Sequence, residues 1–258
     1  MMNTNRPQMW RRDFLKTCAQ KLSLIAGSIV AVGGMKAMAG EENDKYNPSE
    51  HNYAMAIDIH KCIGCGRCVE ACKKENNVPL DGAHFRTWVE RYIIPEDGET
   101  YVDSPNGGMN GFPELKSDKN VLRTFFVPKL CNHCEDPPCV QVCPVGATYI
   151  SPDGVVLVDS EYCVGCRYCI QACPYGARYL HPEKLVAEKC TFCYHRITKG
   201  LLPACVEVCP TGARIFGDLK KTSSPLRRFF HFMDISVLKP WMNTKPKVYY
   251  GSIDGEVK

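Results

Sequence analysis

Sixteen of the seventeen cysteines in this 258-residue chain fall into four groups of four, and no other feature constrains the fold as strongly. Groups one and three have the spacing C-x2-C-x2-C-x3-C, group two has C-x2-C-x4-C-x3-C, and group four has C-x2-C-x11-C-x3-C. The groups are Cys62, Cys65, Cys68 and Cys72; Cys131, Cys134, Cys139 and Cys143; Cys163, Cys166, Cys169 and Cys173; and Cys190, Cys193, Cys205 and Cys209. The core of this chain must therefore gather four sets of closely spaced thiols.

The third group, with Pro174 after its last cysteine, matches the bacterial ferredoxin pattern C-x2-C-x2-C-x3-C-P letter for letter. Three thiolates on one tight loop can reach three irons of one cubane, while the fourth points to a neighbouring cluster. Proline after that cysteine cannot donate a backbone hydrogen bond and turns the chain outward. Glycines such as Gly64, Gly66 and Gly165 let backbone amides approach the inorganic sulfurs. Sixteen thiolates, at four per cubane, predict four [4Fe–4S] clusters.

Three other uses of cysteine fit this spacing less well. A disulfide framework suits an exported protein, but it does not require the spacing, and cysteines so close together pair awkwardly. A zinc ribbon closes one site with two C-x2-C pairs and would leave the middle cysteines of groups one and three unused. Redox-active C-x-x-C pairs would number one or two rather than occur in every group. The spacing therefore favours iron–sulfur clusters.

The first forty residues are typical of an export signal. Arg11-Arg12, followed by Asp13-Phe14-Leu15-Lys16, resembles the twin-arginine signal, which exports proteins already folded around a cofactor. The uncharged stretch Leu22–Met35 is short for a membrane span, and Ala37-Met38-Ala39 has the small-x-small pattern of a cleavage site. We expect residues 1–39 to be a signal peptide and Cys18 within it to be incidental. The alternatives are an ordinary N-terminal helix with chance arginines or a segment retained as a single anchor.

The sequence repeats itself after the last cysteine of groups two, three and four. The copies are Cys-Pro-Val-Gly-Ala-Thr at 143–148, Cys-Pro-Tyr-Gly-Ala-Arg at 173–178 and Cys-Pro-Thr-Gly-Ala-Arg at 209–214. Group one departs from the repeat, because Lys73 and not proline follows Cys72. Internal repetition of this kind predicts duplicated ferredoxin modules.

Short strands and short helices are expected around the cysteines. The expected strands are Tyr53–Ile59, Trp88–Ile94 and Arg123–Val127, with a hairpin over residues 149–158 that turns at Pro152-Asp153-Gly154. The expected helices are Val69–Lys74, Thr191–Lys199 and Ala204–Val208. These elements are too small to form much core without the clusters, so we expect the apo chain to be largely unfolded.

The predicted fold class is α+β, built from duplicated bacterial ferredoxin-like modules that form two dicluster units. We place the four-cluster domain at residues 40–220, with an insertion at 95–120. Its stretch Glu96–Lys119 is rich in Gly, Pro, Asn and Asp and is expected at the surface. Residues 221–258 form a C-terminal arm with scattered aromatic residues, which we expect to pack on the body or on a partner.

Taken together, the four groups resemble the four-cluster electron-transfer subunits of the dimethyl sulfoxide reductase type. This family includes iron–sulfur subunits of polysulfide, tetrathionate and nitrite reductases and of the sulfite-reduction-associated complex. The resemblance covers about residues 50 to 220. It is carried by Cys-Ile-Gly-Cys-Gly-Arg-Cys at 62–68, Leu-Cys-Asn-His-Cys at 130–134 with Pro-Pro-Cys at 137–139, Cys-Thr-Phe-Cys at 190–193 and Leu-Leu-Pro-Ala-Cys at 201–205.

The resemblance also implies which cysteines share a cluster. In the outer pair, one cluster would be held by Cys62, Cys65, Cys68 and Cys209, and the other by Cys190, Cys193, Cys205 and Cys72. In the inner pair, one would be held by Cys131, Cys134, Cys139 and Cys173, and the other by Cys163, Cys166, Cys169 and Cys143. Some members of the family replace one cysteine and carry a three-iron cluster, but all sixteen are present here.

The function implied by the resemblance is that of a non-catalytic electron-transfer subunit in the periplasm. It would relay electrons between a multi-helix quinone-binding membrane subunit and either a molybdopterin catalytic subunit or a multihaem cytochrome. The complex would belong to anaerobic respiration and act on a sulfur compound. The sequence contains no Rossmann glycine fingerprint, P-loop or nucleophile elbow, and no catalytic residues are assigned. The rival hypotheses are a stand-alone iron–sulfur reductase and a redox sensor or assembly factor.

Several residues near the cysteines are candidates for supporting roles. Arg167, Arg178, Lys189 and Arg214 are close to ligands in sequence and are candidates to offset cluster charge. His133 lies between two ligands, and we favour a packed, hydrogen-bonded histidine over one that tunes a cluster. The aromatic residues are expected to shield and pack rather than to relay electrons: Tyr168, Tyr175, Phe192 and Tyr194.

The net charge of the chain is +4, which by itself would hint at an anionic partner such as nucleic acid. The signal segment accounts for it, because Arg6, Arg11, Arg12, Lys16, Lys21 and Lys36 against Asp13 give +5 and leave −1 for the rest. Each oxidised cubane with four thiolates adds about −2, so four would bring the assembled protein to roughly −9. The basic character belongs to the export signal, and the hint of nucleic-acid binding disappears with it.

Overall fold

The computed structural model describes residues 46–96, 98–115, 120–253, 255 and 257. Residues Asn47–Lys258 form one compact unit, and everything that follows concerns this unit. The expected signal peptide, residues 1–39 with Cys18, lies outside the described residues.

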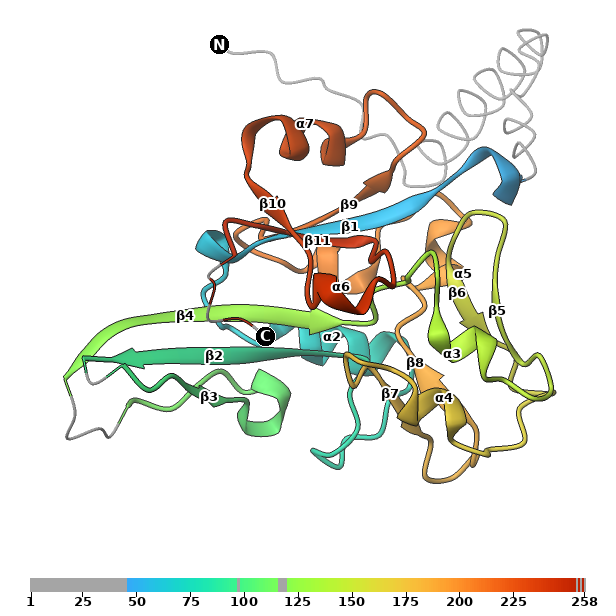
Figure 1. Cartoon of the computed structure of the whole chain (residues 1–258), viewed down its shortest axis with the longest axis horizontal. Helices are drawn as coiled ribbons and strands as arrows, with labels where there is room; N and C mark the ends of the chain where they lie inside the picture. The colour runs from blue at the N-terminus through green and yellow to red at the C-terminus, as the bar shows by residue number, and fades with distance from the viewer. Residues whose placement is uncertain (1–45, 97, 116–119, 254, 256, 258) are drawn as a thin grey trace, which may run out of the picture. The chain divides into compact units, whose positions relative to one another are not determined.

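A four-stranded sheet in the order β10-β11-β1-β9 lies at the centre of this unit (Figure 1). Its strands are β1 Tyr53–Asp58, β9 Arg214–Asp218, β10 Ile235–Ser236 and β11 Val248–Gly251. All residues of β1 are buried, as the apolar run Tyr-Ala-Met-Ala-Ile suggests, and β1 pairs antiparallel with β9 and parallel with β11. The expected strand at Tyr53–Ile59 is therefore confirmed up to Asp58, and Ile59 begins a 3-10 helix.

The two faces of β1 pack against different partners, because successive side chains point to opposite sides of a strand. Ala54 and Ala56 pack against Leu226 and Phe229 of helix α7, Pro225–Phe232. Met55, which lies between the two alanines, lines a cavity ringed by cysteines. The sheet thus separates α7 from the thiols.

The C-terminal segment completes this sheet rather than only covering it. Strand β11 pairs with β1, and the buried Tyr250 donates its hydroxyl hydrogen bond to the carbonyl of Pro128 at 3.0 Å. Between α7 and β11, the backbone amide of Lys247 donates to the carbonyl of Asn132 at 2.9 Å. The expected arm therefore packs on the body of the protein and contacts the chain at the start of the second cysteine group.

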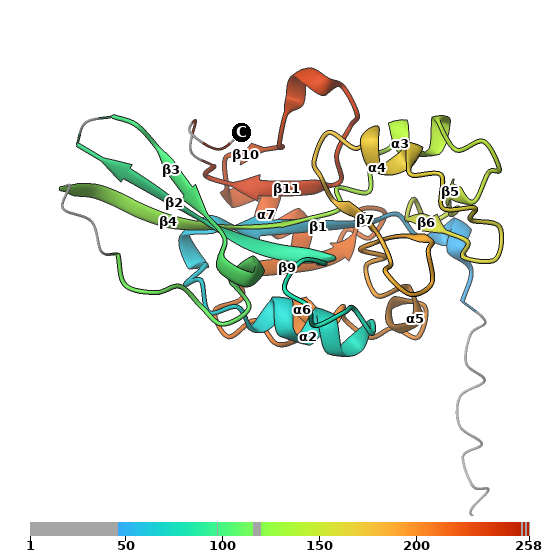
Figure 2. The same cartoon turned by 90° about the horizontal axis from the view of Figure 1, so that it is seen from below.

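A second sheet has the order β3-β2-β4 and extends as a long ribbon (Figures 1 and 2). Its strands are β2 Thr87–Pro95, β3 Tyr101–Asp103 and β4 Val121–Leu130. The expected strands Trp88–Ile94 and Arg123–Val127 lie inside β2 and β4 and pair with each other.

The stretch 96–119 is only partly the surface insertion expected from its composition. Strand β3 pairs with β2, and the 3-10 helix η3, Pro105–Gly108, is buried at Gly107 and Gly108. The carbonyl of Gly108 lies so close to Gly66 that a Cβ there would collide with it. Gly66 has a φ of 72°, so only glycine fits both the conformation and the space beside group one. Residues 97 and 116–119 lie outside the described residues.

Two short hairpins and several short helices lie around the cysteines. The hairpins are β5 Thr148–Ile150 with β6 Val156–Val158, as expected, and β7 Arg178–Leu180 with β8 Ala187–Lys189. The helices are α2 Arg67–Glu75, α3 Pro138–Gln141, α4 Tyr168–Gln171, α5 Tyr194–Ile197 and α6 Ala204–Glu207. Three further 3-10 helices are η1 Pro48–Glu50, η2 Ile59–Lys61 and η4 Pro240–Met242.

The helix expected at Thr191–Lys199 is shorter than predicted. Phe192 and Cys193 have φ values of 53° and 51°, and L-residues in this left-handed region do not continue a right-handed helix. Helix α5 therefore begins only at Tyr194. The left-handed pair turns the loop so that the amide of Phe192 donates to the sulfur of Cys190 at 3.4 Å.

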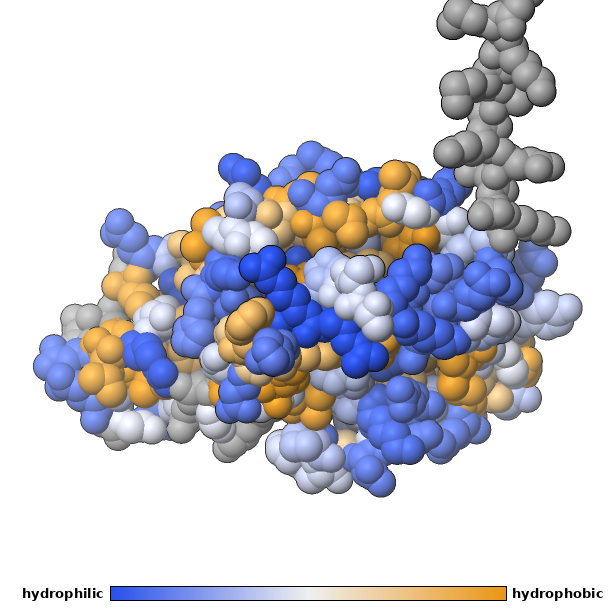
Figure 3. Space-filling model, turned by 90° about the horizontal axis from the view of Figure 1, so that it is seen from above, coloured by the Kyte–Doolittle hydropathy of each residue, from blue (hydrophilic) through white to orange (hydrophobic). Residues whose placement is uncertain are grey.

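None of the helices in the described part of the chain is both long and apolar enough to cross a membrane. On the face drawn in Figure 3, hydrophobic residues form separate patches among hydrophilic ones.

Candidate metal centres

The first cavity ringed by thiols, site I, is lined by Cys62, Cys65, Cys68 and Cys209. The first three cysteines come from the loop before α2 and from α2 itself, and Cys209 follows α6. The structure thus brings a cysteine of group four to the first three cysteines of group one.

The second cavity, site II, is lined by Cys72, Cys190, Cys193 and Cys205. Helices α2 and α6, which pack against each other, each serve both cavities. Helix α2 places Cys68 at site I and Cys72, one turn later, at site II. Helix α6 places Cys205 at site II, and Cys209 after its end reaches site I. This crossing of fourth cysteines is the exchange that the sequence resemblance implies for the outer pair.

The third set of thiols, site III, gathers Cys131, Cys134, Cys139 and Cys173. Burial raises the pKa of the Cys134 thiol to about 12, and the nearby thiols of Cys131, Cys139 and Cys173 add to that rise. These four cysteines come from groups two and three, in the combination that the resemblance implies.

Helix α3 packs against α4, and the resemblance implies a fourth set of thiols here, site IV, with the same crossing of fourth cysteines. Cys163 and Cys169 pack in one apolar cluster with Val156 and Ala187. Cys143, after α3, accepts a hydrogen bond from the amide of Thr148 at 3.5 Å. Cys143 and Cys166 are assigned to site IV with Cys163 and Cys169 by the resemblance.

The thiols are free, and burial disfavours the charged form of several of them unless a cation compensates. All sixteen cysteines of the four groups are outside disulfides. Burial raises the pKa of Cys62 and Cys205 to about 11 each, and that of Cys72 well above its usual value. Metal binding supplies the missing compensation, because a coordinated thiol is deprotonated.

Buried cations beside the thiols provide the test of whether an anionic metal cluster fits. Arg214 lines site I, is 3% exposed, and its Nε and Nη1 have no hydrogen-bond partner among the described residues. Arg178 is 5% exposed, donates from Nη2 to the sulfur of Cys139 at 3.0 Å, and its Nε has no partner among those residues. Buried donors are rarely left unpaired. Unpaired guanidinium donors beside rings of thiols fit a negatively charged group with sulfur acceptors.

No three His, Cys, Asp or Glu side chains among the described residues are arranged to hold a single metal ion.

Comparison with known proteins agrees with these centres. Two family models, both described as a 4Fe–4S dicluster domain, match residues 61–147 and 122–219. The chain is 45% identical over 247 residues to a tetrathionate reductase subunit of Salmonella typhimurium, covering 95% of this chain and 88% of that protein. It is 42% identical over 223 residues to a putative dimethyl sulfoxide reductase iron-sulfur subunit of Halobacterium salinarum, covering 80% of each. It is 37% identical over 198 residues to a polysulfide reductase subunit of Wolinella succinogenes, covering 76% and 92%.

The chain belongs to this family of iron–sulfur electron-transfer subunits. Two dicluster domains account for four [4Fe–4S] clusters, the number expected from sixteen thiolates. They also confirm the predicted α+β fold of duplicated ferredoxin-like modules. When bound, the clusters take up and release single electrons, and the chain sets their spacing, insulation and electrostatic surroundings.

Contacts between the sites arrange them in series. Sites I and II share α2 and α6. Site II lies near site III. Burial is the main cause of the raised pKa of Cys190, the site II thiols Cys205 and Cys193 add to it, and the site III thiol Cys131 adds to it as well. Site III meets site IV where Cys139 packs in the cluster that contains Cys163 and Cys169. The order along the subunit is therefore I, II, III, IV.

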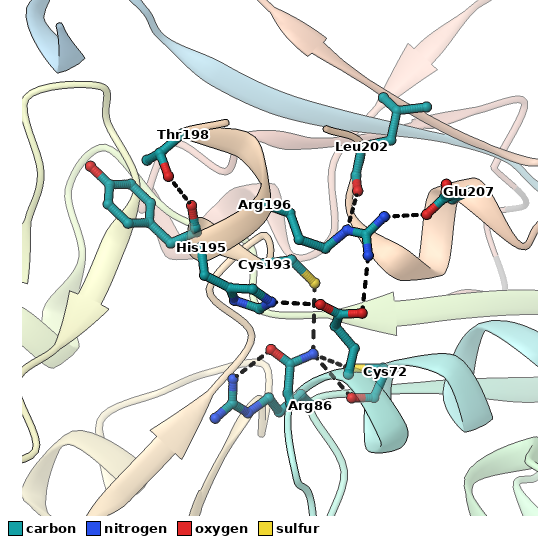
Figure 4. A network of polar contacts seen from close by, with 11 residues as sticks. Cys72, Arg86, Cys193, His195, Arg196, Thr198, Leu202 and Glu207 are labelled. Atoms are coloured by element: carbon teal, nitrogen blue, oxygen red, sulfur yellow. Dashed lines mark hydrogen bonds and ion pairs between the residues drawn. The ribbon is translucent and has the colours of Figure 1, made fainter. Parts of the chain in front are cut away.

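Site II has a network of side-chain contacts around its ligands (Figure 4). The amide of Asn76 donates to the sulfurs of Cys72 and Cys193, each at 3.6 Å. Arg86 donates to Asn76 at 3.1 Å and forms an ion pair with Glu188 at 2.8 Å. The network fixes two ligands of site II that lie far apart in the sequence.

The same network continues from the end of α2 to α5 and α6. Glu75 accepts from His195 at 2.6 Å and from Arg196 at 3.0 Å, and Arg196 also pairs with Glu207. Sequence analysis missed Asn76, Arg86 and Glu75 as supporting residues. Asn76 and Glu75 could have been suspected from their place just after Cys72, whereas Arg86 carries no local signal.

The supporting residues expected from sequence divide by burial. Arg178, Lys189 and Arg214 are buried, whereas Arg167 is exposed. His133 is fully buried and stacks on Phe192 with 3.7 Å between ring centroids. Its Nδ1 accepts from the amide of Val156 at 3.1 Å, but its Nε2 has no partner among the described residues. His133 is thus packed as expected, but only one of its ring nitrogens is satisfied.

The four aromatic residues near the cysteines also differ in their surroundings. Phe192 is buried, and Tyr175 and Tyr194 form hydroxyl contacts with Thr244 at 2.6 Å and Ser151 at 2.9 Å. Tyr168 is 57% exposed, so the shielding and packing expected of all four is found for three of them.

Proposed function

We propose that this subunit relays single electrons in the periplasm, through its four clusters, between a membrane quinone-interacting subunit and a second redox subunit of a sulfur-compound respiratory complex. The second subunit is a molybdopterin enzyme or a multihaem cytochrome. The proposal includes export by the twin-arginine route, with residues 1–39 as signal, 40–220 as the four-cluster domain and 221–258 as the C-terminal arm. It also includes the ligand assignment of sites I to IV given above.

One observation carries the relay: the thiols are exposed only at the two ends of the series. Cys65 of site I and Cys166 of site IV are exposed, whereas all four cysteines of site II are buried. At site III three cysteines are buried and Cys173 is intermediate. A partner can therefore approach the first and the last site closely, while the middle sites pass electrons only through the protein.

An exposed apolar side chain stands two residues before each of the two exposed thiols. Ile63 beside Cys65 is 59% exposed, and Val164 beside Cys166 is 65% exposed. Exposed apolar residues that gather in one patch mark sites of protein–protein contact. Two of the relatives are named as subunits of a tetrathionate reductase and of a polysulfide reductase, which supports a sulfur compound as the terminal substrate of the complex.

The test uses the complex purified from membranes, with Ile63→Asp and Val164→Asp as a matched pair. In the unmodified complex, a quinol should reduce the clusters, and tetrathionate or polysulfide should reoxidise them. Each variant should retain four clusters but lose one half-reaction at least tenfold, and the two variants should lose opposite halves. Reduction of the unmodified complex by dithionite alone, with no response to quinol, would refute the relay. Loss of the same half-reaction in both variants would refute the assignment of the two ends.

A further inference from the structure

We propose that three buried cations, Arg214, Lys189 and Arg178, each lie in one of the three gaps between successive clusters and raise the reduction potentials of the two clusters flanking that gap. The inference rests on the ligand assignment within the proposed function. It assigns to each cation a place and a pair of clusters, which sequence proximity to the cysteines does not provide.

Arg214 lies in the gap between sites I and II. Its side chain lines the site I cavity, and its Nη2 donates to Thr87 Oγ1 at 2.8 Å. Thr87 itself lines the site II cavity. Although burial lowers the pKa of Arg214, thiols of both sites, Cys68 and Cys205 first among them, raise it above its usual value. The guanidinium therefore acts on both cavities.

Lys189 lies in the gap between sites II and III. Its Nζ donates to the carbonyl of Cys190, a site II ligand, at 2.8 Å, and also to the carbonyl of Val156. Val156 packs in the apolar cluster that contains Cys139 of site III and Cys169 of site IV. Burial lowers the pKa of Lys189, and the thiols that counter this lowering are Cys131 and Cys139 of site III and Cys190 of site II. Lys189 is 1% exposed, so its ammonium group is held between the two sites out of contact with water.

Arg178 lies in the gap between sites III and IV. Its Nη2 donates to the sulfur of Cys139 of site III, and its Nη1 donates to Thr148 Oγ1 at 3.4 Å. The amide of Thr148 in turn donates to the sulfur of Cys143, which is assigned to site IV. Arg178 and Arg214 stand at the same position of the Cys-Pro-x-Gly-Ala-Arg repeat, and each reaches a threonine at the neighbouring site.

The effect on potential follows from electrostatics inside a protein. One electron enters a cluster from a redox partner or a neighbouring cluster, no covalent bond changes, and the cluster becomes more negative by one charge. A fixed cation nearby stabilises that added charge, far more in the interior than in water. A cation between two clusters stabilises both reduced states and also weakens the repulsion between two neighbouring reduced clusters.

Arg167 provides the contrast within the same chain. It follows Cys166 directly in the sequence, as Lys189 directly precedes Cys190, but it is exposed to solvent. Water and salt screen an exposed charge. Arg167 and Lys189 are therefore equally close to a ligand in the sequence. They differ in that Lys189 is buried in a gap and Arg167 is not.

The test is a redox titration followed by EPR on the cluster-loaded full chain, with Arg214→Met, Lys189→Met, Arg178→Met and the control Arg167→Met. Each gap variant should make two of the four midpoint potentials more negative. At a fixed potential the ratio of reduced to oxidised cluster should fall at least tenfold, about 59 mV for one electron. Arg214→Met and Arg178→Met should move different pairs, and Lys189→Met should move one member of each pair. Arg167→Met should change every ratio less than twofold.

This pattern of overlap needs no prior assignment of the EPR signals. Equal movement of all four potentials, movement of the same pair by Arg214→Met and Arg178→Met, or no movement in loaded variants would overturn the proposal. Unchanged potentials alongside an intact relay would reject the gap cations and leave the proposed function standing.

Further variants separate charge from packing. Arg214→Lys, Arg178→Lys and Lys189→Arg keep the cation and should restore the potentials to within twofold of the parent ratio. Gln at each position keeps N–H donors without charge and should behave like Met, so parent-like potentials in a loaded Gln variant would overturn the proposal. If neither neutral variant binds iron and sulfide, full loading of the charge-keeping variant supports the gap cation, and its failure to load counts against it.

Discussion

The helix of the first cysteine group, α2, spans nine residues, whereas the helices of the three groups that end in Cys-Pro, α3, α4 and α6, span four each. The difference follows from one position. Proline after the last cysteine cannot continue a helix, and Lys73 after Cys72 can. Lys73 is 2% exposed, donates to the carbonyl of Pro79 at 2.6 Å and lies 4.1 Å from the ring centroid of Phe85.

The extra turn of α2 changes the surroundings of site II. It places Glu75 and Asn76 where they contact α5 and the sulfurs of two ligands. Cys143 and Cys209, which are each followed by proline, accept hydrogen bonds from backbone amides of the turn instead. Burial raises the pKa of these two thiols, but the hydrogen bonds, from Thr148 to Cys143 and from Arg214 to Cys209, lower it. The amide side chain of Asn76 thus contacts the last cysteine of group one, whereas backbone amides contact the last cysteines of groups two and four.

The largest effect, loss of a whole cluster, should come from removing the fourth cysteine of group one or of a group that ends in Cys-Pro. We expect Cys72→Ser to lose the site II cluster and Cys209→Ser to lose the site I cluster, because serine is a poor ligand for iron. Iron and sulfide analysis with EPR should show one of four clusters lost in each variant, whereas Cys18→Ser should lose none.

Double variants test the crossed ligation directly. Cys72→Ser combined with Cys190→Ser should lose no more iron than either change alone, because both act on one cluster. Cys72→Ser combined with Cys62→Ser should lose two clusters. The reverse pattern would show that group one holds its own fourth cysteine.

A smaller effect should follow when group one is given the proline of the other groups. Lys73→Pro removes a helical hydrogen bond, clashes with the preceding turn and removes the contacts of the Lys73 side chain, and we expect destabilisation of about 3 kcal/mol or more. The temperature at which cluster absorbance bleaches should fall clearly. Pro210→Ala, placed beyond the end of α6, should change it far less. Equal shifts for the two variants would mean that the length of α2 does not matter for stability.

Much of this architecture was predictable because it is local. Strand β1 is an apolar run, the hairpin β5–β6 has a Pro-Asp-Gly turn, and the cysteine spacings specify cubane ligands without any knowledge of the fold. The helix at α5 was predicted too long because the left-handed conformation of Phe192 and Cys193 is imposed by the cluster loop and leaves no mark in composition.

Other features depend on contacts between residues far apart in the chain. The parallel pairing of β11 with β1 joins Val248 to Met55, and Arg214 reaches Thr87 across the molecule. Nothing near Arg167 or Arg178 in the sequence shows that one is exposed and the other buried between two sites. Sequence spacing identifies the ligands, but the electrostatic surroundings of the ligands come from the tertiary fold.

The smallest effect we predict concerns the part of the site II network that joins the end of α2 to α5 and α6. Glu75→Gln should remove a carboxylate that pairs with His195 and Arg196, at a cost of about 0.5 kcal/mol, because partly exposed ion pairs contribute little. The hydrogen bond from His195, followed by Arg196, lowers the pKa of Glu75. A carboxyl group with a lowered pKa stabilises the fold above its unfolded pKa and loses that contribution as the pH falls through its folded pKa. Bleaching temperatures of parent and Glu75→Gln should therefore differ at pH 7 and converge below about pH 4.

Glu70→Gln, which breaks the exposed pair with Lys74 on the same helix, is the matched control and should shift the temperature less. A difference between parent and Glu75→Gln that persists at low pH would show that the network acts through shape and packing and not through the charge of Glu75.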